Sequence, residues 1–101
     1  MKHTQQPVIK ENSSFARIAA AFRKEPRIAM VLGNTIHLYG VTEGAFRANT
    51  RWVRHEMAHI RQFRQYGTAG FILRYVWEWI KHGYTNNRFE VEARAAEDEV
   101  V

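Results

Sequence analysis

Hydrophobic positions recur at helical spacing in four stretches of the chain. The first is Phe15–Lys24, where apolar residues three or four apart predict a helix that Ser13 or Ser14 can cap and that Pro26 ends. The same spacing predicts three further helices, from Asn49 or Thr50 to Tyr66, over Thr68–His82 and over Arg88–Glu99.

Two short runs rich in β-branched and other apolar residues lie between the first and second helices. Ile28–Leu32 and Thr35–Tyr39 flank the dipeptide Gly33-Asn34, and two turn residues between such runs predict a tight β-hairpin. Gly40 and Gly44 then bracket a predicted loop. The order helix, hairpin, helix, helix, helix predicts an α+β fold.

The chain has the size of one domain, and we take residues 1–101 as a single domain. Met1–Glu11 is polar and contains Pro7, so residues 1–12 are predicted to form a polar N-terminal tail or extended lead-in. A hydrophobic content of 46% with 13% aromatic residues is enough for a packed core and too much for a disordered chain.

Neither a signal peptide nor a membrane span is predicted. Met1–Lys10 contains no apolar core of a signal sequence, and the most apolar run, Phe71–Ile80, is short and interrupted by Arg74 and Glu78. We therefore expect a cytoplasmic protein. The aromatic residues of this run, Tyr75, Trp77 and Trp79, are expected to form core beneath the site, and the alternative is that one of them lines a hydrophobic specificity pocket.

Cysteine is absent and arginine is abundant. Without cysteine, a bound metal has only His, Asp and Glu as strong ligands. The formal net charge is +5, and eleven of the fifteen cationic residues are arginine, so a basic nucleic-acid-binding module is one alternative function. A solvated basic helix face accounts for this charge more simply.

The second predicted helix contains the motif His55-Glu56-Met57-Ala58-His59, an HExxH sequence. Two histidines four residues apart lie on one face of a helix and can bind the same Zn²⁺. Glu56 can then take a proton from a water that the zinc activates and deliver it to the leaving amine. Trp52 and Phe63 share the face of the histidines, where imidazoles without a partner would be costly to bury.

A hydrolytic zinc site usually has three protein ligands and one open position. Glu90 and Glu92, near the start of the last helix, are the candidates for the third ligand, and we favour Glu90. Glu97 and Asp98 are less attractive because they lie near the end of the chain, where helices fray.

The HExxH sequence, the aromatic helix that follows it and the segment Asn87-Arg88-Phe89-Glu90-Val91-Glu92-Ala93 resemble the gluzincins. More narrowly, the chain is similar to the minigluzincins, which are single-domain relatives of about this length. The resemblance covers roughly residues 28–96 and implies a short twisted sheet over an active-site helix, followed by a helix that supplies a glutamate ligand.

Two further expectations come from this resemblance. In membrane CAAX-type relatives the Phe-Glu-x-x-Ala-Asp segment offers its glutamate to zinc, which corresponds to Glu90, whereas the aspartate common four residues later in gluzincins is replaced here by Arg94. Glu92 is then a candidate for the residue that hydrogen-bonds His55. Thr35–Tyr39 would form the upper rim of the cleft, as an edge strand that can pair with an extended peptide.

The sequence therefore predicts a zinc-dependent peptidase that acts on peptides or proteins, with Zn²⁺ held by His55, His59 and Glu90 and with Glu56 as general base and acid. The alternative, besides nucleic-acid binding, is a non-catalytic interaction domain stabilised by zinc. The oligomeric state and the cleavage specificity stay open.

A peptidase also needs a group that stabilises the oxyanion, and His37, His82 and Tyr84 are the local candidates. The small size suggests a latent form as well. In that form, Glu97-Asp98-Glu99 or the N-terminal tail would occupy the open metal position.

Overall fold

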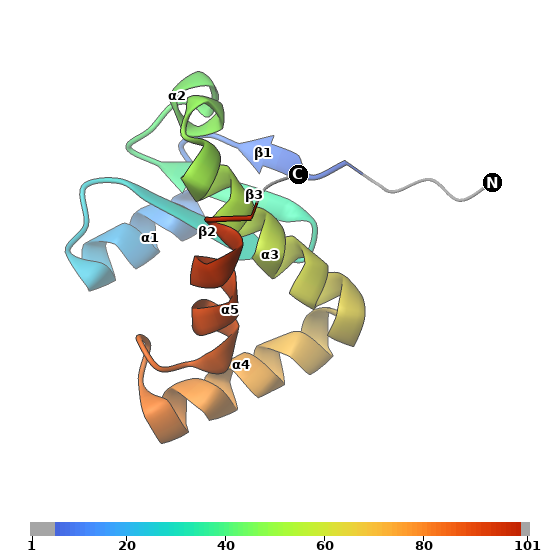
Figure 1. Cartoon of the computed structure of the whole chain (residues 1–101). Helices are drawn as coiled ribbons and strands as arrows, with labels where there is room; N and C mark the ends of the chain where they lie inside the picture. The colour runs from blue at the N-terminus through green and yellow to red at the C-terminus, as the bar shows by residue number, and fades with distance from the viewer. Residues whose placement is uncertain (1–5, 100–101) are drawn as a thin grey trace.

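The structure is a computed structural model and describes residues 6–99. These residues form a three-stranded mixed sheet and five helices (Figure 1). The predicted α+β class is confirmed. In chain order the elements are β1 (Val8–Lys10), α1 (Ser14–Arg23), β2 (Ile28–Leu32), β3 (Thr35–Tyr39), α2 (Glu43–Ala48), α3 (Thr50–Tyr66), α4 (Thr68–His82) and α5 (Arg88–Ala96).

The predicted hairpin is present, but its second strand is not an edge of the sheet. β2 and β3 pair antiparallel around Gly33, whose φ of +64° is the left-handed conformation that the tight turn needs. Val8–Lys10, inside the predicted N-terminal tail, forms β1 and pairs parallel with β3. The strand order β1-β3-β2 therefore makes β3 (Thr35–Tyr39) the central strand, and the prediction that it forms an edge for a peptide was wrong.

The alternation of side chains along the strands divides the core between the two faces of the sheet. On one face, Ile28 packs with Ala16 and Ala20 of α1. On the other face, the β3 residues Ile36 and Leu38 pack with Phe46 of α2 and Ile60 of α3 in the largest fully buried cluster. α3, which carries the HExxH motif, is thus held against the sheet by its own apolar positions.

Small and aromatic residues fix the helices behind α3. Ala58 of α3 packs with Ala93 and Ala96 of α5, and such small side chains allow two helices to approach closely. Phe63 of α3 packs against Phe71 of α4 at a ring-centroid distance of 4.6 Å, and Phe71 against Phe89 of α5 at 5.0 Å. Figure 1 shows α3 between the sheet and the α4–α5 pair.

Three features differ from the expectations. The predicted loop after Gly40 contains the short helix α2, which Thr42 caps by accepting a hydrogen bond from the N–H of Ala45. The last helix ends at Ala96 instead of Glu99. Trp77 and Trp79 are exposed rather than part of the core, because α4 packs inward through Phe71 and Tyr75. Among residues 6–99, no helix is long and apolar enough to cross a membrane.

Candidate metal centre

Helix α3 brings three of the predicted site residues together. Asn49 begins the helix by accepting a hydrogen bond from the N–H of Trp52, and the chain then stays helical through Tyr66. His55 and His59 therefore lie one turn apart on the same face, with ring centroids separated by 5.1 Å. Glu56 is buried beside them, with 5% of its surface exposed.

Helix α5 supplies the carboxylate that faces the two histidines. Asn87, which is fully buried, caps this helix by accepting a hydrogen bond from the N–H of Phe89, and its side-chain amide donates to the carbonyl of Tyr75 in α4. Glu90 thus occupies the third position of a helix whose start is fixed to α4. The positive end of the helix dipole favours a carboxylate there.

The three predicted ligands form a compact group. Glu90 Oε1 lies 3.1 Å from His55 Nε2 and 3.3 Å from His59 Nε2, and one ligand atom from each residue lies within 4.8 Å of the others. Ligands at 2.0–2.1 Å from a tetrahedral zinc are separated by about 3.3 Å, so the distances to Glu90 suit this ion. The group could hold a metal ion, and the structure describes no other such group of three in residues 6–99.

The other nitrogen of each imidazole has a hydrogen-bond acceptor. His55 Nδ1 lies 2.8 Å from Glu97 Oε2, and His59 Nδ1 lies 2.8 Å from Gln62 Oε1. An oxygen acceptor at Nδ1 holds a proton there, so a metal ion could replace the other proton of each ring at Nε2, which faces Glu90. This arrangement is the one that a metal-binding histidine requires.

The partner of His55 is not the residue expected. Glu92, the predicted candidate, is exposed and accepts a hydrogen bond of 2.7 Å from Gln62 Nε2. Gln62 also donates to the carbonyl of Phe89, so its amide is oriented with the oxygen toward His59. Glu92 therefore supports His59 through Gln62, whereas Glu97 contacts His55. Glu92 does not belong to the group of His55, His59 and Glu90 that could hold a metal ion.

Tyr75, which was expected in the core or at a hydrophobic specificity pocket, lines the apolar part of the cleft and also contacts Glu90. Its hydroxyl donates a hydrogen bond of 2.5 Å to Glu90 Oε2, the carboxylate oxygen that faces away from the histidines. Glu90 is 4% exposed and has a hydrogen-bond partner on each of its oxygens. Tyr75 lies four residues after Phe71 on the buried face of α4, which is the only sequence signal for this role.

The electrostatics of the metal-free group reflect burial and close charges. Burial opposes protonation of His55, but hydrogen bonds to Glu90 and Glu97 and the charge of Glu56 outweigh it and raise the pKa to about 9. Burial raises the pKa of Glu56 to about 7. Burial also works against ionisation of Glu90, yet the hydrogen bonds from His55 and His59 hold its pKa far below the usual range. Without a metal ion, the imidazole of His55 is therefore protonated at neutral pH and pairs with the carboxylate of Glu90.

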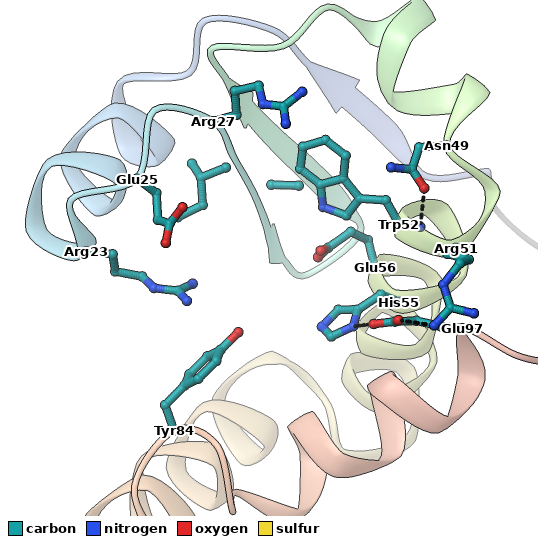
Figure 2. Close-up of a pocket in the computed structure, with 12 residues that line it drawn as sticks. Arg23, Glu25, Arg27, Asn49, Arg51, Trp52, His55, Glu56, Tyr84 and Glu97 are labelled. Atoms are coloured by element: carbon teal, nitrogen blue, oxygen red, sulfur yellow. Dashed lines mark hydrogen bonds and ion pairs between the residues drawn. The ribbon is translucent and has the colours of Figure 1, made fainter.

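A cleft with two parts runs past the group. One part, of about 500 Å³, has a polar lining with both arginine and glutamate side chains, among them Arg27, Arg51 and Glu25 (Figure 2). The other, of about 410 Å³, is lined mainly by apolar residues, which include Phe15, Met30, Leu32, Phe63, Phe71, Ile72 and Val76. His55 and Glu56 line both parts, and Figure 2 shows both side chains pointing into the cavity.

The three candidates for an oxyanion-stabilising group occupy very different places. His37 lies on the α1 face of the sheet, where it bonds Ser13 Oγ at 2.7 Å and contacts the ring of Phe15 at 5.2 Å. His82 is exposed and does not line the cleft. Tyr84 lines both parts of the cleft and stacks under the Arg23 guanidinium at 4.4 Å. Tyr84 is therefore the one candidate of the three that lines the same cleft as His55, His59 and Glu90.

The acidic end of the chain is engaged on the surface of α3. Glu97 bonds Arg51 at 3.0 Å in addition to His55, Asp98 forms an ion pair with Arg51, and Glu99 lies 3.8 Å from Arg61. None of these three carboxylates belongs to the group of His55, His59 and Glu90, next to which the latent form would require one of them. The N-terminal tail was the other candidate for the latent form. Its residues 1–5 lie outside the described residues, and its Val8–Lys10 segment is β1, which pairs with β3.

No family model, curated protein or solved structure matches the chain. The identification of the site therefore depends on the geometry of His55, His59 and Glu90.

Proposed function

We propose that the protein is a zinc-dependent peptidase of the gluzincin type. His55, His59 and Glu90 hold the ion, and Glu56 acts as general base and then as general acid. The observation that carries this proposal is the convergence of two imidazole nitrogens and one carboxylate oxygen at a cleft, with each Nδ1 hydrogen-bonded from behind. Two histidines and a glutamate are a ligand set of known zinc peptidases.

A bound zinc ion would acidify water and polarise a carbonyl group. The residues of the chain supply the rest. Glu56, buried next to His55 and exposed to the cleft through its carboxylate, takes a proton from the attacking water and transfers it to the amine that leaves. Tyr84 lies in the same cleft and is the hydroxyl group available to stabilise the oxyanion.

Within residues 6–99, β2 pairs with β3 alone, so its other edge is where an extended substrate would bind. The carbonyl of Leu38 accepts a hydrogen bond from Ser13 on the β1 side of β3, so Leu38 and its β2 partner Ala29 form a pair without hydrogen bonds between them. Ala29 and Val31 consequently direct their N–H and C=O groups away from β3. Both residues line the apolar part of the cleft, where a peptide strand can pair with them.

The test is hydrolysis of denatured protein substrates by the full chain loaded with zinc, compared with Glu56→Gln. This substitution keeps the shape of the side chain and removes the base, so we expect the zinc content and melting temperature to be retained while hydrolysis falls by a factor on the order of 10² to 10⁴. Glu43→Gln, at an exposed glutamate in α2, is the matched control and should retain wild-type activity.

If zinc-loaded wild type hydrolyses no peptide while zinc raises its melting temperature, the peptidase proposal is wrong. The alternative of a zinc-stabilised interaction domain would then hold, because metal binding contributes to folding without catalysis.

A further inference from the structure

Two helices beside the cleft expose an unusual number of large apolar side chains. α1 exposes three such residues and α4 exposes six. We name these nine residues the α1/α4 apolar surface: Phe15, Ile18, Phe22, Ile72, Leu73, Val76, Trp77, Trp79 and Ile80. Several are largely exposed, as Phe22 at 78% and Ile80 at 72% show. Contiguous apolar surface of this kind marks an interaction site.

The exposed residues on α4 form one continuous face. Phe71 and Tyr75 point inward. Ile72, Val76 and Trp79, spaced by four and three residues, share one side of the helix, and the exposed residues next to them widen this face. The buried core clusters of residues 6–99 do not include this face, and Ile72 and Val76 at its border line the apolar part of the cleft.

The two helices belong to the same side of the molecule. Phe15 of α1 and Ile72 and Val76 of α4 line the apolar part of the cleft. Arg23, the last residue of α1, stacks on Tyr84, which follows α4, at 4.4 Å. The apolar wall of the cleft therefore continues outward onto both helices.

The charges beside this surface are mainly positive. α1 contains Arg17 and Arg23 and no acidic residue, and Lys24 and then the exposed Glu25 follow it. The one acidic residue of α4, Glu78, is only 14% exposed at its side chain and lies 3.9 Å from the ammonium of Lys81. A face of aromatic and aliphatic residues with cationic neighbours is the composition of helices that lie in the interface of an anionic membrane.

We propose that the α1/α4 apolar surface docks on an anionic lipid bilayer and turns the mouth of the cleft toward the membrane. A second copy of this chain is the less suitable occupant, because two bodies with a formal charge of +5 would meet through faces flanked by like charges. Docking does not depend on the peptidase activity. Combined with it, docking implies that the substrates are polypeptides held at a membrane surface.

Flotation of the full chain with lipid vesicles tests this proposal. We expect binding to vesicles of equal parts phosphatidylcholine and phosphatidylserine, weaker binding to phosphatidylcholine alone, and a loss of binding as salt is raised. In Leu73→Ser/Ile80→Ser, both exposed positions lose their apolar side chains, and binding should weaken by roughly tenfold or more per side chain. Val8→Ser/Val91→Ser, at exposed apolar positions outside the surface, is the control and should bind as wild type does.

The contribution of charge is tested with Arg17→Gln/Lys81→Gln. Each basic residue near an anionic surface contributes about fivefold to binding, so this variant should lose affinity for the mixed vesicles and keep its affinity for phosphatidylcholine. The melting temperature of every variant should equal that of wild type, because all these side chains are on the surface.

Three results would overturn the proposal. One is the absence of wild-type flotation with either vesicle at low salt. Another is equal flotation of wild type and Leu73→Ser/Ile80→Ser. The third is a wild-type dimer in analytical ultracentrifugation that Leu73→Ser/Ile80→Ser dissociates, which would assign the surface to a second copy of the chain.

Discussion

The contact between Glu97 and His55 leads to a quantitative prediction about metal affinity. Glu97 Oε2 lies 2.8 Å from His55 Nδ1, and the other oxygen of the same carboxylate is 3.0 Å from Arg51. The carboxylate therefore fixes both the proton on Nδ1 and the orientation of the ring, so that Nε2 faces Glu90. Removing such a partner typically weakens metal binding 10- to 100-fold, or by about 1.4–2.8 kcal/mol.

We expect Glu97→Ala to raise the zinc Kd by about this factor. Glu97→Gln should have an intermediate effect, because its amide oxygen can still accept the proton of Nδ1 while the charge is lost. The assay is competition with a coloured zinc chelator at fixed pH. Glu99→Ala, which removes only the distant pairing with Arg61, is the control. A Kd for Glu97→Ala within twofold of wild type would refute the positioning role.

Three further predictions concern pH, the carboxylate and the core. Because the pKa of His55 is raised from 6.5 to about 9 and that of Glu56 from 4.5 to about 7, the metal-free fold retains protons that the unfolded chain has released. Its melting temperature should thus fall from about pH 4.5 to 7 through Glu56 and from about pH 6.5 to 9 through His55, while zinc stabilises more as pH rises; equal slopes with and without zinc would contradict this. Tyr75→Phe removes the hydroxyl bonded to Glu90 and should weaken zinc binding about tenfold without unfolding, as chelator competition and circular dichroism can check. Leu38→Ala, at a fully buried position, should cost about 2–5 kcal/mol in urea unfolding, and a loss below about 1 kcal/mol would show that Leu38 is not core.

The helix of the motif could be predicted from the sequence because its signals are local. The spacing of His55 and His59 places both on one face, and Asn49 is a recognisable cap. Glu90 could be favoured as the third ligand because it lies near the start of the last helix and corresponds to the glutamate of the Phe-Glu-x-x-Ala-Asp segment. Its convergence on the histidines depends on how α5 packs against α3.

The missed site residues depend on tertiary packing. Glu97 is near the chain end, where fraying was expected, but Ala93 and Ala96 bring α5 against α3 and place its last turn beside His55. Tyr75 has the same periodicity as any core residue of α4, and nothing in the sequence indicates that its hydroxyl meets Glu90.

The errors in the fold have a similar origin. A strand of three residues, Val8–Lys10, gives too short a pattern to be recognised, yet it converts β3 from an edge strand into the central strand. Periodicity also cannot tell which apolar face of a helix is covered. α4 has enough large residues for two faces and buries only the one with Phe71, which leaves Trp77 and Trp79 exposed.

The most direct test of the metal centre is bound metal per chain, measured by elemental analysis on protein purified without a metal-affinity tag. Wild type and Glu92→Ala should each contain about one zinc, and Glu90→Ala should contain none, because two histidines and one carboxylate complete the usual set of three protein ligands. A wild-type protein that binds no zinc even when it is added, or a Glu90→Ala variant that retains the ion, would contradict a site formed by His55, His59 and Glu90.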